Sequence, residues 1–258
     1  MNVLGWILAP FRTVLVIVHT IFCSIVGLAA MALNKNNGDW VMWNVGRVLW
    51  SRPLLQWLVG VKLEVHVSAE AQALADQKKG CVLVANHTSL LDINAAFAAS
   101  PTPIVFLSKA SIRNVPLLGK LNELAGTVFV ERGNRASSER AVNQLTETLK
   151  AGRSVLVFPE GTRSMDGALQ PFKKGAFHLA QAAGAPIVPM HISGTWDLLP
   201  PSGLCIRPPR NRVLILVSEP MPCDPNPEIT KQRVAREMQL LADQSARMQR
   251  TGNPVGRP

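Results

Sequence analysis

A histidine and an aspartate that could act together in catalysis lie five residues apart, at His87 and Asp92. The apolar run before them, residues 81–85, is typical of a short buried strand, and the alanine-rich run after them, residues 93–99, favours a helix. On one continuous helix, side chains five residues apart point about 140° away from each other and cannot touch. We therefore expect His87 to lie in the turn that precedes the helix, so that Asp92 in its early turns can reach back.

A carboxylate bound to one nitrogen of an imidazole fixes the tautomer and leaves the other nitrogen to act as a base. For Asp92 to reach His87 in this way, Thr88 or Ser89 has to cap the helix. The pair is then a serine-protease triad without its serine, so the attacking hydroxyl has to come from the substrate. A capped helix start explains the same pattern without catalysis, and the rest of the chain decides between the two.

Three further polar clusters each follow a predicted strand. They are Glu131–Arg135, Pro159–Ser164 and Ile192–Thr195. Because the carboxyl ends of parallel strands meet at one edge of a sheet, we expect these clusters to surround His87. Arg132, Arg163 and Lys109 would supply cations there, and Gly161 would let a ligand approach the backbone closely. Such an edge suits a phosphate monoester held next to a base.

The elements that must position these groups alternate between strands and helices from residue 61 to residue 250. The expected strands are residues 61–67, 81–85, 104–107, 127–130, 155–158, 187–190 and 213–217. The expected helices are residues 69–77, 93–99, 137–150, 172–183 and 228–249. This alternation predicts an α/β fold with a mixed, mostly parallel sheet flanked by helices. We divide the chain into N-terminal hydrophobic helices (1–60), an α/β domain (61–250) and a disordered tail (251–258).

No charged residue occurs between Thr13 and Leu33, and this segment is about long enough to cross a bilayer as a helix. A helix that lies partly in the membrane, a cleaved signal peptide ending near Ala30–Ala32 and a buried core helix are the alternatives. Membrane association is favoured because the next segment, residues 40–61, is also membrane-seeking.

Trp43, Trp50 and Trp57 are spaced by seven residues in that next segment, which places them nearly on one face of an α-helix. Tryptophan near arginine is typical of an interfacial helix, and Pro53 should kink or end the helix. The sequence thus predicts an N-terminal two-helix membrane-associated motif.

Basic residues flank the first hydrophobic segment unequally. Arg12 precedes it, whereas the residues that follow it are Lys35, Arg47, Arg52 and Lys62. By the positive-inside rule, the remainder of the chain lies in the cytoplasm. We therefore expect the protein at the inner (cytoplasmic) membrane, with its catalytic domain facing the cytoplasm. The four scattered cysteines fit buried thiols in such a reducing compartment.

A net charge of +10 indicates an anionic partner: a membrane surface, a phosphorylated substrate or nucleic acid. A nucleic-acid binder would cluster its basic residues on one element with aromatic residues between them. Here the basic residues are spread, so we expect no nucleic acid. A metalloenzyme would use His66, His87, His178 and His191, whose spacing matches no metal-binding motif. We expect neither a metal nor a cofactor.

Four blocks, in order, resemble the glycerophospholipid acyltransferase family, and within it the 1-acylglycerol-3-phosphate acyltransferases. The blocks are His-x4-Asp at His87–Asp92, Gly-Thr-Val-Phe-Val-Glu-Arg at Gly126–Arg132, Phe-Pro-Glu-Gly-Thr-Arg at Phe158–Arg163, and an apolar run with a proline at Ile187–Met190. The Lys-Gly segment Phe172–Gly175 and the N-terminal hydrophobic helices also look like parts of the family. The resemblance extends roughly from Cys81 to Thr195.

The resemblance implies transfer of a fatty acyl group from a thioester, acyl-CoA or acyl carrier protein, to the sn-2 hydroxyl of lysophosphatidate. His87 is implied to be the base and Asp92 to orient it. The residues implied to hold the phosphate and glycerol of the acceptor are Arg132, Glu160, Gly161, Thr162 and Arg163. Pro189 is implied to lie near the acyl donor. Within the family, the acceptor could instead be glycerol 3-phosphate or a lyso-aminolipid.

Overall fold

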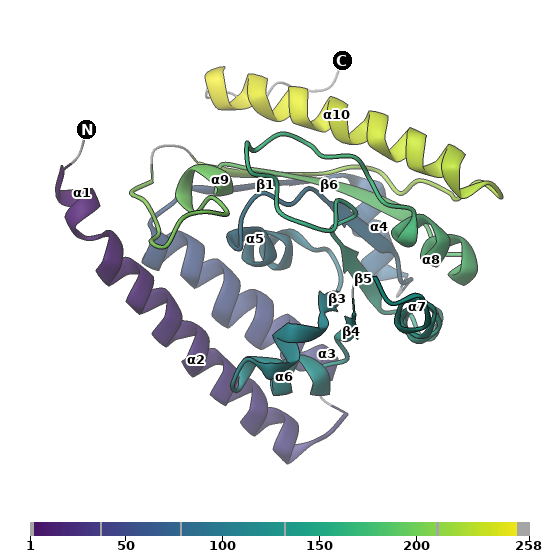
Figure 1. The fold of residues 1–258 in the computed structure, drawn as a ribbon, viewed down its shortest axis with the longest axis horizontal. Helices are drawn as coiled ribbons and strands as arrows, with labels where there is room; N and C mark the ends of the chain where they lie inside the picture. Colours follow the sequence, from purple (N-terminus) through teal and green to yellow (C-terminus); the bar gives the residue numbers. More distant parts are fainter. Residues whose placement is uncertain (1–2, 37, 78, 132, 210–211, 252–258) are drawn as a thin grey trace.

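The structure is a computed structural model that describes residues 3–36, 38–77, 79–131, 133–209 and 212–251. In this part of the chain, seven strands form one sheet in the order β1-β7-β6-β2-β5-β3-β4 (Figure 1). The strands are β1 (Leu63–Val67), β2 (Val82–Ala85), β3 (Ile104–Lys109), β4 (Val128–Val130), β5 (Ser154–Val157), β6 (Ile187–Ser193) and β7 (Val213–Val217). All expected strands are present, and β3 and β6 run further than expected.

Neighbouring strands are parallel in each pair except β6 and β7, which are antiparallel. This confirms the mixed, mostly parallel sheet. Strands β2 to β6 therefore end at the same edge, which we call the carboxyl edge. Strand β2 lies inside the sheet, between β5 and β6. The turn after β2 is thus surrounded by the segments that follow its two neighbours.

Helices cover both faces of the sheet. They are α4 (Ala69–Asp76), α5 (Leu91–Ala99), the 3₁₀-helix η3 (Ala110–Asn114), α6 (Leu118–Leu124), α7 (Arg135–Lys150), α8 (Gly175–Ala183), α9 (Thr195–Leu198) and α10 (Pro227–Thr251). Side chains alternate across a strand. In β2, Leu83 and Ala85 join the core under α5, whereas Val82 and Val84 join the core with α7, α8 and α10. Figure 1 shows α10 along one face and α5 on the other.

The first sixty residues form α1 (Val3–Ile7), α2 (Ala9–Leu33), α3 (Gly38–Trp40) and the helices η1 (Val41–Ser51) and η2 (Leu54–Val59). η1 and η2 are π-helices, in which hydrogen bonds span five residues. The expectation was that Pro53 kinks or ends the helix, and the second of these alternatives is wrong, because the chain stays helical at Pro53. Its φ of −61° and ψ of −38° are helical, because the fixed φ of proline fits a helix.

The prediction that the tryptophans share one face is also wrong. A π-helix has more residues in each turn than an α-helix, so a spacing of seven does not return to the same face. Trp50 turns inward: its ring centroid lies 5.7 Å from that of Phe97, and its Nε1 donates a hydrogen bond to Thr20 Oγ1 at 3.0 Å. Trp57, in contrast, is 80 % exposed.

Helix α2 has one covered face and one bare apolar face. Cys23 and Met31 pack against η1 and α6. The exposed apolar side chains include Phe11, Val14, Ile17, Val18, Ile21, Phe22 and Ile25. Among the described residues, α2 is the one helix long and apolar enough to cross a membrane, and most of its apolar stretch is not buried within the protein.

The N-terminal helices and the sheet share one hydrophobic core. Met42, Leu54 and Leu55 belong to the same cluster as Leu83 of β2. Helix η2 ends at Gly60, whose φ of +78° is the left-handed conformation that glycine favours at a helix end. The division of the chain near residue 60 stays a prediction. Apart from Thr251, the proposed tail lies outside the described residues.

Candidate active site

The His87–Asp92 pair forms as expected at the carboxyl edge. His87 lies in the turn after β2, and Asp92 lies in the first turn of α5. His87 Nδ1 and Asp92 Oδ2 are 3.0 Å apart. The carboxylate therefore fixes which nitrogen of the imidazole carries the proton. Nε2, the other nitrogen, has no hydrogen-bond partner among the described residues and is left to act as a base.

The prediction that Thr88 or Ser89 caps α5 is wrong, although Asp92 reaches His87 as expected. Neither Thr88 nor Ser89 is the N-cap, which is Leu90 without a side-chain cap. Instead, the backbone N–H groups of Thr88 and Ser89 donate to Asp92 Oδ2 at 2.6 and 2.7 Å. A carboxylate is a stronger acceptor than a hydroxyl, so it takes the unpaired N–H groups of the turn. Ser89 Oγ still accepts from Leu91 N at 3.2 Å.

The second oxygen of Asp92 is held by a residue from another part of the chain. Thr195 Oγ1, at the start of α9, donates to Asp92 Oδ1 at 2.5 Å. Thr195 Oγ1 also lies 3.3 Å from Thr88 Oγ1. The sequence placed Thr195 in the third polar cluster but gave it no role. The signal available in the sequence was only its place in a polar cluster that follows a predicted strand.

The imidazole of His87 is supported on its flat side by Phe158. The two rings are stacked, with centroids 4.1 Å apart and planes inclined by 19°. The His87 side chain is 16 % exposed, while that of Asp92 is completely buried. The ring is thus held by a hydrogen bond along one edge and by an aromatic face, and only a small part of it remains open.

The segment after β5 fastens the backbone of His87. Glu160 Oε1 accepts the His87 N–H at 3.0 Å, and Ser164 N donates to the His87 carbonyl at 2.8 Å. Glu160 is only 4 % exposed. Its carboxylate is therefore turned towards the His87 backbone, whereas the sequence suggested contact with substrate. We interpret Glu160 as a residue that positions His87.

Burial, together with the smaller effect of the nearby Asp92 carboxylate, raises the pKa of Glu160 to about 7. In the unfolded chain this carboxyl titrates near 4.5. The folded protein therefore holds a proton that the unfolded chain loses between these two values. The contribution of the protonated Glu160 to the free energy of unfolding is therefore complete below pH 4.5 and is lost as the pH rises towards 7.

Replacing Glu160 with glutamine should remove this pH-dependent loss of stability, because glutamine does not titrate. Its amide oxygen can still accept the hydrogen bond from His87 N. Relative to wild type, we expect the Glu160→Gln variant to gain up to about 3 kcal/mol of unfolding free energy between pH 5 and pH 8. Denaturant unfolding across this pH range measures the gain. Glu147→Gln, at an exposed position on α7, is the control. A pH-independent difference between Glu160→Gln and wild type would contradict the interpretation.

The predicted phosphate ligands lie around the turn of the same segment. Gly161 has a φ of +74°, the left-handed conformation that glycine favours, and the Lys173 side chain crosses the turn where a Cβ would otherwise lie. Thr162 is exposed and Arg163 half-buried. Lys109, at the end of β3, is exposed at the same carboxyl edge. Arg132 lies outside the described residues, and its role stays a prediction.

Pro189 does not lie at the carboxyl edge. It is buried inside β6, opposite Val84 of β2, and its carbonyl accepts from Ser218 N at 2.9 Å. Because Pro189 is buried, it exposes no surface that an acyl donor could contact directly, so its predicted place near the donor stays a prediction.

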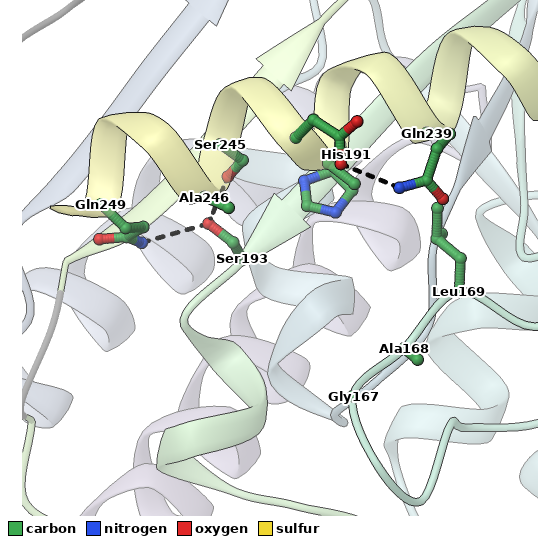
Figure 2. A pocket seen from close by; sticks show the side chains of 11 residues that line it. Gly167, Ala168, Leu169, His191, Ser193, Gln239, Ser245, Ala246 and Gln249 are labelled. Carbon is green, nitrogen blue, oxygen red and sulfur yellow. Dashed lines mark hydrogen bonds between the residues drawn. The ribbon is translucent and has the colours of Figure 1, made fainter.

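The histidines weighed as a metal set are dispersed. His66 lies on β1 and His178 on α8. His191 faces α10 across a cavity of about 440 Å³ whose other lining residues include Ser193, Gln239 and Gln249 (Figure 2). Burial lowers the pKa of His191 to about 4, so the ring is neutral at pH 7. The described residues contain no group of three potential metal ligands.

The fold and this site define the class of protein. The profile of the Acyltransferase family matches residues 62–193, which include the His87 turn and the Glu160 segment. The chain belongs to this family.

Individual relatives agree with the family match. The chain is 33 % identical over 249 residues to the 1-acyl-sn-glycerol-3-phosphate acyltransferase of Saccharomyces cerevisiae, covering 95 % of this chain and 78 % of the relative. It is 37 % identical over 139 residues to the enzyme of the same name from Salmonella typhimurium, covering 54 % of this chain and 55 % of the relative.

A solved structure has the same fold. The 1-acyl-sn-glycerophosphate acyltransferase of Thermotoga maritima superimposes with a TM-score of 0.72, at 24 % identity, over 90 % of this chain and 97 % of that one. This confirms the expected α/β fold, with its mixed, mostly parallel sheet flanked by helices.

Proposed function

We propose that the protein is a 1-acylglycerol-3-phosphate O-acyltransferase. It transfers a fatty acyl group from acyl-CoA or acyl carrier protein to the sn-2 hydroxyl of 1-acyl-glycerol 3-phosphate, and the product is phosphatidic acid. The observation that carries the proposal is the His87–Asp92 contact at the carboxyl edge, where Nε2 of His87 has no hydrogen-bond partner in the part of the chain that the structure describes. The names of the relatives support the choice of acceptor.

The site supports direct transfer between the two substrates. Nε2 of His87 removes the proton of the acceptor hydroxyl as its oxygen attacks the thioester carbonyl. A carbon–oxygen bond forms and the carbon–sulfur bond breaks. The proton held by His87 then goes to the departing thiolate, which restores the base. No nucleophile from the enzyme is required, because the thioester is already activated, and Asp92 stabilises the protonated imidazole in between.

The cations of the carboxyl edge are suited to the acceptor's phosphate. Arg163 lies in the segment that fastens His87, and Lys109 lies at the end of β3 on the same edge. Arg163 offers a planar group that matches phosphate with two parallel hydrogen bonds. Arg132 is proposed to join them. A phosphate held here would bring the glycerol hydroxyl of the same molecule towards His87.

Product analysis with purified protein tests the function. Each acceptor (lysophosphatidate, glycerol 3-phosphate or a lyso-aminolipid) is offered with acyl-CoA and, separately, with acyl carrier protein. We expect labelled phosphatidic acid from lysophosphatidate and little product from the other two. Preferred acylation of glycerol 3-phosphate or of the lyso-aminolipid would overturn the choice of acceptor. Depletion of the protein in cells should in parallel cause lysophosphatidate to accumulate.

We also propose that α2 holds the enzyme at the inner membrane, with the α/β domain facing the cytoplasm. The bare apolar face of α2 supports this, since burying it in lipid contributes about 25 cal/mol for each Å² removed from water. The chemistry supports it too, because acceptor and product are lipids whereas the thioester arrives from the cytoplasm. A site at the surface receives the lysolipid without its leaving the bilayer entirely.

Placing charge on the bare face of α2 should release the protein from membranes. The variant Ile17→Glu with Ile21→Glu should move most of the protein into the soluble fraction, whereas wild type should resist washing with high salt or carbonate, because screening affects charges and not buried apolar surface. The control is Leu240→Glu, since Leu240 is an equally bare apolar residue on α10. Release of wild type by salt alone would contradict an embedded helix.

A further inference from the structure

We propose that Thr195 is a positioning residue for catalysis: its hydroxyl holds the Asp92 carboxylate and thereby sets the strength of His87 as a base. This inference rests on the proposed function, because it assigns a role in the same reaction. Thr195 does not touch His87, and it acts through Asp92. It lies beyond the segment matched by the family profile, which ends at residue 193.

The two oxygens of Asp92 are held from different directions. Oδ2 accepts from His87 Nδ1 and from the N–H groups of Thr88 and Ser89, all within the turn after β2. For Oδ1, the partner among the described residues is the hydroxyl of Thr195, at 2.5 Å. Asp92 and Thr195 are both completely buried. Because the carboxylate is fully buried, one protein hydroxyl decides whether Oδ1 is satisfied.

The backbone before Thr195 is built to deliver this hydroxyl. Gly194 has a φ of +90°, and a Cβ there would lie 2.3 Å from the carbonyl oxygen of Arg212. Only glycine allows β6 to turn so sharply against β7. The turn places Thr195 beside Thr88, whose Oγ1 lies 3.3 Å from Thr195 Oγ1. Because Thr195 donates to Asp92, its oxygen is left to accept from Thr88, so the hydroxyl has one orientation.

Loss of the hydroxyl has a directional effect on His87. A hydrogen bond to Oδ1 draws negative charge away from the oxygen that faces the imidazole. Without it, the carboxylate attracts the protonated imidazole more strongly, so His87 keeps its proton to higher pH and is inactive as a base over a wider range. A carboxylate with one unpaired, buried oxygen also holds the imidazole less firmly in its orientation.

The test uses the full-length protein with Thr195→Val, which has nearly the same shape without the hydroxyl, and Thr195→Ser, which restores it. The control is Thr146→Val on α7, because Thr146 is also buried and its hydroxyl has no hydrogen-bond partner among the residues that the structure describes. Acyl transfer from acyl-CoA to lysophosphatidate is measured from pH 5 to pH 9. In parallel, NMR follows the ring of His87 through the same titration, which requires no turnover. Glu160, with a pKa of about 7, and His191, with a pKa of about 4, also act on Asp92, but both are present in every variant, so the difference between variants reports the Thr195 hydroxyl.

For Thr195→Val we expect kcat/KM to fall about ten- to a hundredfold, with the acidic limb of the pH profile about half to one unit higher. The NMR midpoint of His87 should move by the same amount. Thr195→Ser and Thr146→Val should resemble wild type. An unchanged midpoint in Thr195→Val, or a Thr195→Ser variant that folds normally but behaves like Thr195→Val, would overturn the inference. If wild type transfers no acyl group, the proposed function fails, and the NMR midpoint alone then decides on Thr195.

Discussion

Replacing His87 with alanine should abolish acyl transfer while leaving folding and membrane association intact. Nε2 of His87 is the group proposed to take the proton of the acceptor hydroxyl, and the ring is partly exposed at the carboxyl edge. Asp92→Asn should lower kcat on the order of 10²- to 10⁴-fold, because an amide can hold the wrong tautomer of the imidazole and does not stabilise its protonated form. The measurement is single-turnover transfer by purified enzyme.

The matched control for this change is His66→Ala. His66 lies on the edge strand β1, where it pairs with Glu64 at 2.9 Å, so its loss removes a histidine without touching the site. Thermal unfolding and membrane fractionation should be alike for all variants. A His87→Ala enzyme that retains more than a tenth of wild-type turnover would show that the proposed base is wrong.

Removing the guanidinium of Arg163 should raise the KM for lysophosphatidate about ten- to a hundredfold and change the KM for the acyl thioester far less. A charge-assisted hydrogen bond contributes roughly 1.5–3 kcal/mol, which corresponds to this factor. Arg163 makes no ion pair with another described residue, so its substitution leaves no carboxylate behind without a partner. Steady-state kinetics with each substrate varied in turn measure the two constants.

Arg250→Ala, near the end of α10, is the control for loss of one positive charge. Arg132→Ala is expected to behave like Arg163→Ala. Lysophosphatidylcholine, whose phosphate is a diester with a cationic head group, should be a poor acceptor for wild type. An equal rise in KM for both substrates would indicate that Arg163 supports the fold instead of binding the phosphate.

The strands were predictable because each is a short apolar run that ends in polar residues. That pattern also gave the position of the site, since parallel strands bring their carboxyl ends together. Cys81 to Ala85 leads directly to His87, and Val155 to Phe158 leads to Glu160. The polar residues that follow such runs had to converge on one edge. The His87–Asp92 contact was expected from helix geometry, on the condition that His87 lies in the turn before the helix.

What the sequence could not provide were contacts between residues far apart in the chain. The family resemblance implied that Glu160 holds the substrate, but its partner is the backbone N–H of residue 87, which has no sequence signature. Thr195 was one polar residue among several, and its partner Asp92 is more than a hundred residues away. The tryptophan spacing failed for a different reason, because it assumed an α-helix where the chain forms a π-helix.

The pairing of β1 with β7 has a consequence for how the protein is made. Leu63 of the first strand lies opposite Val213 of the last, so the sheet is complete only when nearly the whole chain has left the ribosome. Helix α2 precedes all of it and emerges first. Pairing between such distant strands is slow, because a long loop has to close before any contact forms. On the proposal that α2 is the membrane anchor, this helix reaches the bilayer while the α/β domain is still an unfinished chain, and the sheet would then complete its folding at the membrane surface.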